Sequence, residues 1–391
     1  DHDYFQNSWE FGNQQFSLSA PITPFLRSES VLRKAIEGAG YTWNDRFHSS
    51  DELRKLVLVS NRTMWIDDTL NLNAPLSAFL PDQNVSDLLK EYCRLFCLAP
   101  FSNVTGNVIS LQPLAAIVNN EPRYDWTNYA GREHEKNNFN GGVSKYEYPE
   151  AALSNSYRES EYLNLGQPDV ILPDFIDTQD YQVGLTYFLL SRNLYIRAYD
   201  IEGTRLFGFA QGFGAIENDF GQEIVSPNLT PLQTSQILFY PNISDNLLMG
   251  HWSNALAPPL TAGVGSPGGN AVGLQLSLYR GYANTTNGAS YPFGSMNNYS
   301  VNFQELTDQD HVLHWLGDKG LYNKFWRDWD AMLQRSGAVT RTFLLPLAQL
   351  LDFDFQFKVR VGGQNYFVRS LEFNVTLSGI SPAKCELLSV S

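Results

Sequence analysis

Phe353-Asp-Phe-Gln-Phe-Lys-Val-Arg-Val361 is the stretch that decides the fold, because apolar side chains occupy every odd position. The even positions are polar: Asp354, Gln356, Lys358 and Arg360. A period of two is typical of an antiparallel strand with one buried face and one exposed face. Gly362 and Gly363 follow and can adopt the positive φ angles of a tight hairpin turn. The pattern predicts a strand over residues 353–361 that turns back at the glycines.

The segments on either side extend this pattern. Residues 321–334 have helical periodicity, and residues 339–345 form a strand-like run after them. Downstream, residues 371–377 alternate between apolar and polar side chains, and a last strand is expected around residues 385–390. The end of the chain therefore predicts a helix followed by a β-meander.

A second, less regular unit of the same kind lies earlier in the chain. Residues 85–97 place their apolar side chains on one helical stripe, and Asn84 is a suitable N-cap for that helix. A turn and a strand over residues 108–111 follow. We interpret the two units as related modules.

The region between the units is mainly β in character. Residues 193–199 and 204–209 predict a hairpin, residues 236–240 predict a strand, and residues 258–300 predict a long connection interrupted by a strand at 274–279. We therefore predict an α+β fold, mainly antiparallel β. In this fold two barrel-like helix-plus-meander modules, residues 1–135 and 311–391, flank an inserted mostly-β region, residues 136–310.

Composition narrows the function classes. The 391 residues suffice for two or three domains, and 43% of them are hydrophobic, as in globular proteins. The net charge of −14 argues against a protein that grips nucleic acid through its phosphates. Cys93, Cys97 and Cys385 are too few for a structural zinc site, and we expect buried, reduced thiols. No run approaches the ~18 apolar residues of a membrane span, so we expect none.

One segment has the residue types of a metal site. Two histidines three residues apart could share a helical face, and nearby carboxylates could complete the ligand set. No glutamate base lies between the histidines, as it does in zinc proteases, and a polar helix start explains the segment equally well. We do not predict a metal there. The residues are Asp308, Asp310, His311, His314 and Asp318.

The remaining candidates for chemistry are weak. Asp67 with Asp68, or Asp352 with Asp354, could act as the paired carboxylates of a glycosidase, but 41 acidic residues produce such pairs by chance. Trp326 and Trp329 could stack on sugars, yet at helical spacing such residues are more often core. Nucleotide-binding and hydrolase motifs are absent. We predict no enzyme activity, no catalytic or metal-binding residues and no cofactor.

Four segments together resemble the tail structural proteins of phages and prophages of Bacteroides-type bacteria. They are Pro24-Phe25 followed by Leu32-Arg-Lys-Ala-Ile-Glu-Gly-Ala-Gly-Tyr41; Leu80-Pro-Asp-Gln-Asn-Val-Ser-Asp-Leu-Leu89 with Asp125-Trp126-Thr127; Gly320-Leu-Tyr-Asn-Lys-Phe-Trp326; and Val359-Arg-Val-Gly-Gly-Gln-Asn-Tyr-Phe367 with Cys385-Glu-Leu-Leu388. The resemblance covers residues 20–130 and 315–391.

The resemblance implies a tail or baseplate hub. In such proteins two related barrel-like domains per subunit assemble as a trimer into a ring that continues the tail tube. We then expect partners among its own copies and other tail or baseplate proteins, with DNA only passing through, and location in the virion tail after assembly in the bacterial cytoplasm. The side chains expected at the channel or the neighbouring subunit are Asp354, Gln356, Lys358 and Arg360.

Two alternatives remain open at this point. The aromatic and Asn-rich middle region also fits a carbohydrate-binding or glycan-degrading surface protein of a gut bacterium. An adhesin-like β-protein unrelated to phages is the third possibility.

Overall fold

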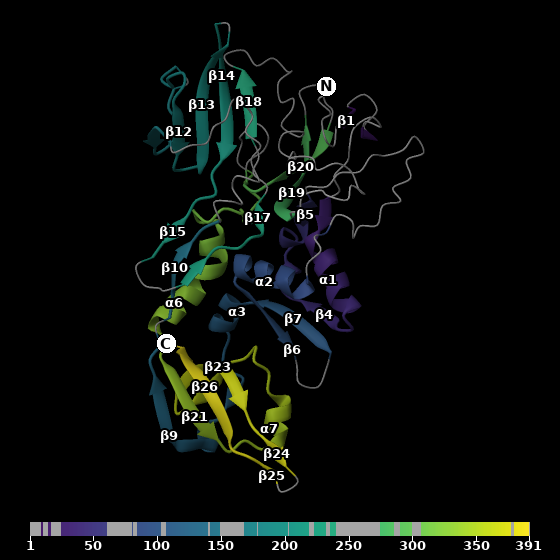
Figure 1. Ribbon diagram of the computed structural model, residues 1–391, viewed down its shortest axis with the longest axis vertical. Coiled ribbons are helices and arrows are strands. Elements are labelled where there is room, and N and C mark those ends of the chain that lie inside the picture. The colour runs from purple at the N-terminus through teal and green to yellow at the C-terminus, as the bar shows by residue number, and fades with distance from the viewer. Residues whose placement is uncertain are drawn as a thin grey trace.

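The computed structural model is an elongated α+β molecule, rich in antiparallel sheet, with two β lobes at opposite ends and the long helices between them (Figure 1). The structure describes residues 9–10, 15–16, 25–60, 80, 84–102, 107–139, 141–148, 168–177, 179–201, 203–218, 223–231, 235–239, 274–284, 290–298, 306–376 and 379–390. Within these ranges, no helix is long and apolar enough to span a membrane.

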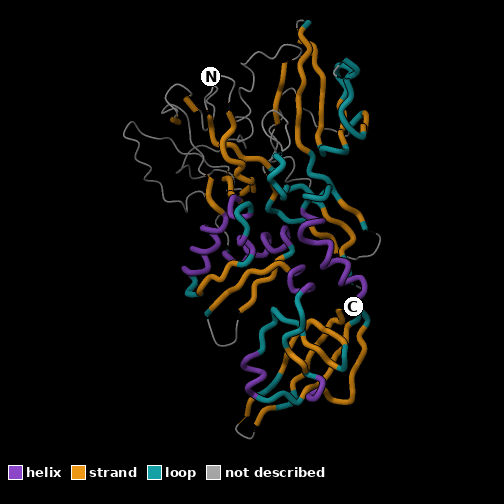
Figure 2. The backbone as a smooth tube through the Cα atoms, turned by 180° about the vertical axis from the view of Figure 1, so that it is seen from behind, coloured by secondary structure: helices purple, strands orange, loops and turns teal. Residues whose placement is uncertain are grey.

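The central body contains all the described α-helices except the one at residues 347–352. Seen from behind, they form a layer above a three-stranded sheet (Figure 2). That sheet has the order β4 (Thr42–Asp45), β7 (Val108–Pro113) and β6 (Leu98–Ser102). The helices are α1 (Ser28–Gly38), α2 (Val85–Phe96), α3 (Leu114–Asn119), a π-helical turn η5 (Tyr322–Trp326) and α6 (Arg327–Arg335).

Helix α2 confirms the prediction for residues 85–97. Its apolar stripe, which includes Leu88, Tyr92 and Leu95, is buried in the main hydrophobic core. The helix ends because Cys97 adopts a left-handed conformation with a φ of 50°, which reverses the chain into β6.

Two further sheets complete the body. The first has the order β17 (Thr230–Pro231), β19 (Leu274–Asn284), β5 (Leu56–Ser60) and β3 (Phe25–Arg27), with β20 (Ser290–Ser295) paired to β19. The second has the order β15 (Ile216–Glu217), β10 (Val143–Tyr146) and β16 (Glu223–Val225). Strand β19 confirms the strand predicted at residues 274–279 and extends it to Asn284, whereas β20 lies in a stretch that was expected to be a connection.

The lobe at one end is a five-stranded sheet. Its order is β11 (Val170–Leu172), β12 (Thr186–Leu189), β13 (Leu194–Ile201), β14 (Thr204–Gln211) and β18 (Ser235–Phe239). The predicted hairpin is confirmed as β13 and β14, and Gly203 supplies a φ of 78° in its turn. The predicted strand at 236–240 is confirmed as β18.

The C-terminal lobe at the other end is a six-stranded half-barrel. Its order is β8 (Tyr124–Asp125), β22 (Val359–Val361), β23 (Gln364–Glu372), β26 (Ala383–Val390), β21 (Ala338–Phe343) and β9 (Ala130–Asn137). Helix α7 (Leu347–Asp352) and the ribbon of β24 (Val375–Thr376) and β25 (Gly379–Ile380) lie at its far end (Figure 1).

The curvature of the half-barrel follows from its connectivity. Strands β8 and β9 lie at opposite edges of the sheet, yet only residues 126–129 separate them in the chain. Trp126 lies at this bend, is fully buried, and has its ring centroid 5.3 Å from that of Phe343 and 5.0 Å from that of Phe353. The short connection requires the sheet to curl around this aromatic interior.

The predicted strand over residues 353–361 is wrong for its first part. Only Val359–Val361 form a strand, and the Phe357 N–H donates to the Asp354 carbonyl across a turn. The Asp354 carboxylate accepts the Gln356 N–H, as expected for an aspartate at the start of a turn. Phe353, Phe355 and Phe357 all pack on the apolar core of the lobe from this turn. Their spacing in the sequence therefore resembles that of a strand. The hairpin at Gly362 and Gly363, with φ of 59° and 87°, is confirmed.

The predicted domain boundaries do not follow the sheets. The boundary at 135 falls inside β9, which pairs with β21, and β8 pairs with β22. Strand β5 from the predicted first module pairs with β19 from the predicted insertion. Strands that pair in these sheets therefore come from distant segments of the chain that are buried together.

The remaining elements are short. They are the strand pair β1 (Trp9–Glu10) and β2 (Gln15–Phe16) and the 3-10 turns η1 (Phe47–Ser49), η2 (Leu53–Lys55) and η4 (Thr127–Tyr129).

Candidate functional site

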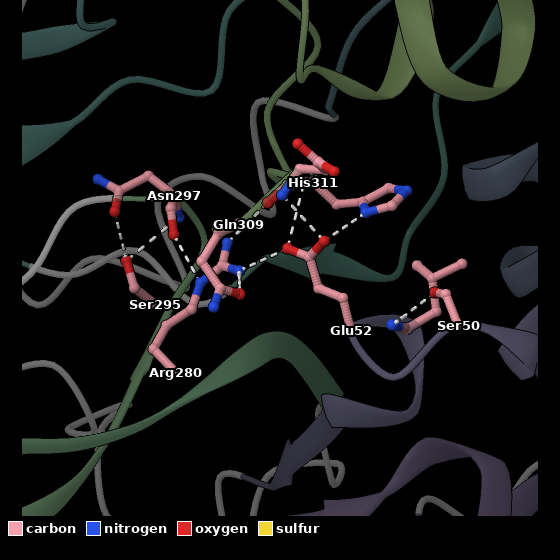
Figure 3. A network of polar contacts seen from close by, with 9 residues as sticks. Ser50, Glu52, Arg280, Ser295, Asn297, Gln309 and His311 are labelled. Carbon is pink, nitrogen blue, oxygen red and sulfur yellow. Dashed lines mark hydrogen bonds and ion pairs between the residues drawn. The ribbon is translucent and has the colours of Figure 1, made fainter. Parts of the chain in front are cut away.

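The most connected polar cluster surrounds Glu52, which lies between Arg280 and His311 (Figure 3). Its Oε1 accepts from Arg280 Nη1 at 2.8 Å and from the His311 N–H at 3.1 Å. Its Oε2 accepts from the Asp310 N–H at 3.0 Å and lies 2.7 Å from His311 Nδ1. Every carboxylate oxygen therefore has two partners.

Arg280 also has most of its hydrogen-bond donors occupied. Its side chain is 0% exposed, and three further N–H groups donate to the Asn297 carbonyl, to Gln309 Oε1 and to the His311 carbonyl. Burial lowers the pKa of Arg280, and the hydrogen bond and charge of Glu52 oppose that effect. The guanidinium thus depends on Glu52 for its compensating charge.

The network sets the charge of Glu52. Burial alone would raise the pKa of Glu52, but hydrogen bonds from His311, from the Asp310 N–H and from Arg280 outweigh burial and hold it at about 2. A carboxylate with so low a pKa stays ionised near neutral pH and is a poor proton donor. Through Glu52, which directly precedes η2, the cluster links this turn to β19 and to residues 309–311. These segments are up to 259 residues apart, so the cluster acts as a cross-link.

A second cluster has the residue types of a hydrolase triad. Asp45 Oδ2 lies 2.5 Å from His48 Nδ1, and His48 Nε2 lies 3.3 Å from Ser28 Oγ and 2.9 Å from the Tyr92 hydroxyl. Ser28, His48 and Tyr92 are at most 2% exposed, and the Tyr92 hydroxyl also lies 3.0 Å from Ser28 Oγ. The nucleophile position is therefore covered by protein, and the cluster joins α1, η1 and α2 inside the core.

A third buried group is Asp330 on α6, which is 0% exposed. Its carboxylate accepts from the Val143 N–H at 3.1 Å, from Asn218 Nδ2 at 3.1 Å and from the Tyr322 hydroxyl at 3.3 Å. These bonds attach the sheet of β10 and β15 to the helix. All three clusters join segments that are distant in sequence.

The four residues predicted for the channel face do not form one exposed surface. Gln356 and Lys358 are 9% and 6% exposed, Asp354 is half-buried, and Arg360 is exposed. Lys358 Nζ donates to the Val118 carbonyl at 2.8 Å, and burial lowers the pKa of Lys358. The reason is the turn at residues 354–357, which replaces the expected alternation. Their assembly role stays a prediction, and only Arg360 and Asp354 are accessible for it.

The segment with the histidines differs from its expected form. Residues 306–320 contain no helix, His311 is bound to Glu52, and His314 is buried. Burial lowers the pKa of His314 to about 4, against a hydrogen bond with the Leu316 backbone that raises it. Among the described residues, no group of three or more His, Cys, Asp or Glu side chains is arranged to hold a metal ion.

The structure also locates most of the other residues that the sequence had suggested for chemistry. Cys93, Cys97 and Cys385 are free thiols, and burial raises the pKa of Cys93 and Cys385 to about 12. Asp352 lies 3.7 Å from Arg123. Trp326 donates to the Leu95 carbonyl from the core. Asp67 and Asp68 lie outside the described residues.

Sequence reasoning missed Glu52, Arg280, Asp45, His48 and Asp330. The Asp-x-x-His spacing of residues 45 and 48 is a local signal that could have been noticed. The Glu52–Arg280 pair leaves no local signal in the sequence, because the two residues are 228 positions apart.

Comparison with protein-family models, curated proteins and solved structures finds no match for this chain.

Proposed function

We propose that the chain is a non-enzymatic structural subunit that associates with its own copies as a phage tail or baseplate hub. The observation that carries the proposal is the apolar surface of the C-terminal half-barrel. Leu344, Leu347 and Leu351 are 68%, 45% and 48% exposed, and Leu347 and Leu351 lie one helical turn apart on α7. Val375 on the neighbouring ribbon is 64% exposed.

Such a surface is costly in water for an isolated molecule. Contiguous exposed apolar groups mark interaction sites in soluble proteins. Figure 1 places α7 and β24 together at the free end of the molecule, where a neighbouring subunit could cover both. The polar clusters of the body, in contrast, face their own chain and leave no open carboxylate or nucleophile for chemistry.

The charge of the chain agrees with the hub role. A net charge of −14 repels DNA phosphates, so a channel built from this subunit would let a genome pass without binding it. The resemblance of residues 20–130 and 315–391 to tail proteins adds the expectation of a trimeric ring. The half-barrel is the part that we assign to the ring, with Arg360 and Asp354 as the accessible polar candidates.

The mass of the chain in solution tests this proposal. We expect a discrete oligomer, a trimer for the hub, by native mass spectrometry and sedimentation velocity. Replacing Leu344, Leu347 and Leu351 by glutamate should yield a folded monomer. Leu190→Glu is the matched control, because Leu190 is 57% exposed in the opposite lobe and should leave the oligomer intact. A wild-type monomer at all concentrations would contradict the proposal.

A glycan-binding role is the second candidate, and one observation favours it. Phe188 and Tyr195 lie directly opposite each other on β12 and β13, with ring centroids 4.7 Å apart. Ile171 continues this row on β11 and is 59% exposed. Aromatic rings on a sheet can stack on sugars. A glycan array with the wild type and Tyr195→Ala tests this role, and binding to no glycan would remove it.

A further inference from the structure

Residues 212–215 connect the five-stranded lobe to the central body, from the end of β14 to the start of β15 (Figure 1). Among the described residues this is the only covalent connection between the two regions. Gly212 belongs to the lobe, because its N–H donates to the Asn193 carbonyl at 2.7 Å and its carbonyl accepts from Asn193 Nδ2. Phe213, the next residue, is buried in the main hydrophobic core of the body. The position of the lobe therefore depends on how this connection is held.

The irregular segment of residues 313–316, here called the latch, holds the connection. The Trp315 N–H donates to the Phe213 carbonyl at 3.0 Å. The Leu316 side chain packs directly on Gly214, where an added Cβ would lie 2.6 Å from Leu316 Cγ. Gly214 also has a φ of 66°, which favours glycine. The latch thus contacts the connection through one backbone bond and one close apolar contact.

The same segment is fixed to the body. The Leu313 N–H donates to the Met296 carbonyl at 2.6 Å, and the Leu313 carbonyl accepts from the Tyr148 hydroxyl at 2.8 Å. The Leu321 N–H donates to the His314 carbonyl at 3.0 Å. The latch therefore joins the body to the connection, and His314 lies between its two anchoring residues, Leu313 and Trp315.

His314 is buried without a charged partner. The residue is 9% exposed, and its Nδ1 has no hydrogen-bond partner among the described residues. Burial lowers the pKa of His314 from 6.5 to about 4, and the bond with the Leu316 backbone opposes this shift only in part. The imidazole is therefore neutral in the closed latch near neutral pH, whereas in water it would begin to take up a proton below pH 6.5.

The charged groups of the surrounding elements do not compensate a proton on His314, since none of them shifts its pKa. The carboxylates bound elsewhere are Glu52, which pairs with Arg280 and His311, Glu147 and Glu217, which pair with Lys145, and Asp330, which accepts from Val143, Asn218 and Tyr322. The exposed carboxylates are Asp308, Asp310 and Asp318, and the remaining cations are Lys319, Lys324 and Arg327. Burial keeps the nearby tyrosines neutral by raising the pKa of Tyr146, Tyr148 and Tyr322.

We propose that the latch is an acid-sensitive lock on the five-stranded lobe: protonation of His314 opens the latch, releases residues 212–215 and lets the lobe turn relative to the body. A charged imidazole without a carboxylate partner is costly to bury, so the protonated side chain moves to water and takes the latch with it. Because the pKa is lower in the closed latch than in water, closure is fully favoured above pH 6.5 and is lost as the pH falls through 4. This motion occurs within one copy of the chain and does not depend on the proposed oligomer.

Amide hydrogen exchange of the full chain at pH 8 and pH 5 tests the proposal. The protection factors of the Leu313 and Trp315 N–H groups report the opening of the latch, because both groups are hydrogen-bonded only while it is closed. We expect opening to increase about thirtyfold between pH 8 and pH 5, from the difference between the two pKa values of His314. Glu52, whose pKa is about 2, stays ionised at pH 5. The amides of α2 and β13 should keep their protection, since the body and the lobe remain folded.

Three variants separate the latch from other effects of pH. His314→Gln removes the titrating group and should abolish the increase at pH 5. His134→Gln is the matched control, because His134 is exposed on β9 and its loss should leave the increase unchanged. Gly214→Ala forces a side chain into a φ of 66° and against Leu316, so it should open the latch at both pH values.

Two results would overturn the proposal. The first is a latch whose protection is the same at pH 8 and pH 5 in the wild type, or changes equally in His314→Gln. The second is loss of protection in the latch and in α2 together, since the chain would then unfold as one unit. The comparison of the wild type with His134→Gln decides between these results even if His314→Gln does not fold.

Discussion

The central body and the C-terminal half-barrel are stabilised in different ways. The body joins distant segments through buried charges and hydroxyls, of which Glu52 and Arg280, 228 residues apart, are the clearest pair. The half-barrel surrounds an apolar interior with Trp126 at its bend, and four of its six strands, β21, β22, β23 and β26, lie within residues 338–390. Removing one partner of a buried ion pair leaves an uncompensated charge and strongly lowers the stability, whereas an apolar core loses stability in proportion to the side-chain volume removed. The comparison predicts that the two regions respond to different perturbations.

The largest effect is expected from Trp126→Ala. The substitution empties the interior between Phe343 and Phe353 and should destabilise the half-barrel by about 4 kcal/mol. Hydrogen exchange should show lost protection in β21 and β26 while α2 stays protected. Uniform loss across both regions would show that the chain unfolds as one unit.

Glu52→Gln should destabilise the central body by nearly as much as Trp126→Ala destabilises the half-barrel. The variant leaves the Arg280 guanidinium buried without a carboxylate, at a cost of about 3 kcal/mol. Urea unfolding measures the loss. The double variant Glu52→Gln with Arg280→Met removes the unpaired charge and should regain part of the stability. A double variant less stable than Glu52→Gln would contradict the assignment.

The same pair predicts a pH response confined to the body. Because hydrogen bonds lower the pKa of Glu52 from 4.5 to about 2, its contribution is complete above pH 4.5 and disappears as the pH falls through 2. The loss should reach up to about 3 kcal/mol between these limits. Unfolding curves of the wild type and Glu52→Gln should converge at low pH. Parallel curves would show that other carboxylates control acid stability.

A smaller loss of stability is expected at the glycine hairpin of the half-barrel. Gly362→Ala forces a side chain into a φ of 59° and should cost about 1–2 kcal/mol. Gly337→Ala is the matched control, because the φ of Gly337 lies outside the left-handed region and an added Cβ would meet only Ser389 Oγ at 3.7 Å. Equal stability of the two variants would argue against the hairpin.

The smallest effect is expected at the surface of the same sheet. Arg369 Nη1 lies 3.0 Å from Glu386 Oε1, with side chains 47% and 35% exposed. Water screens such a pair, so Arg369→Ala should change the unfolding free energy by less than about 1 kcal/mol. Thermal unfolding at low and high salt checks this value.

The sequence by itself determined the local elements. The apolar stripe of α2, the double glycine at the hairpin, the helix that ends in α6 and the hairpin of β13 and β14 depend on spacing within one segment, and each is found as predicted. The α+β class, rich in antiparallel sheet, followed from the same patterns.

Tertiary structure alone decided which segments lie together. The turn at residues 353–357 is held by Tyr124, which bonds to the Asp352 carbonyl and the Asp354 N–H, and no pattern within residues 353–361 specifies that partner. The pairing of β5 with β19 and the Glu52–Arg280 bond have the same origin. The physical reason is that burial and charge compensation act between segments hundreds of residues apart, whereas periodicity describes only neighbours along the chain.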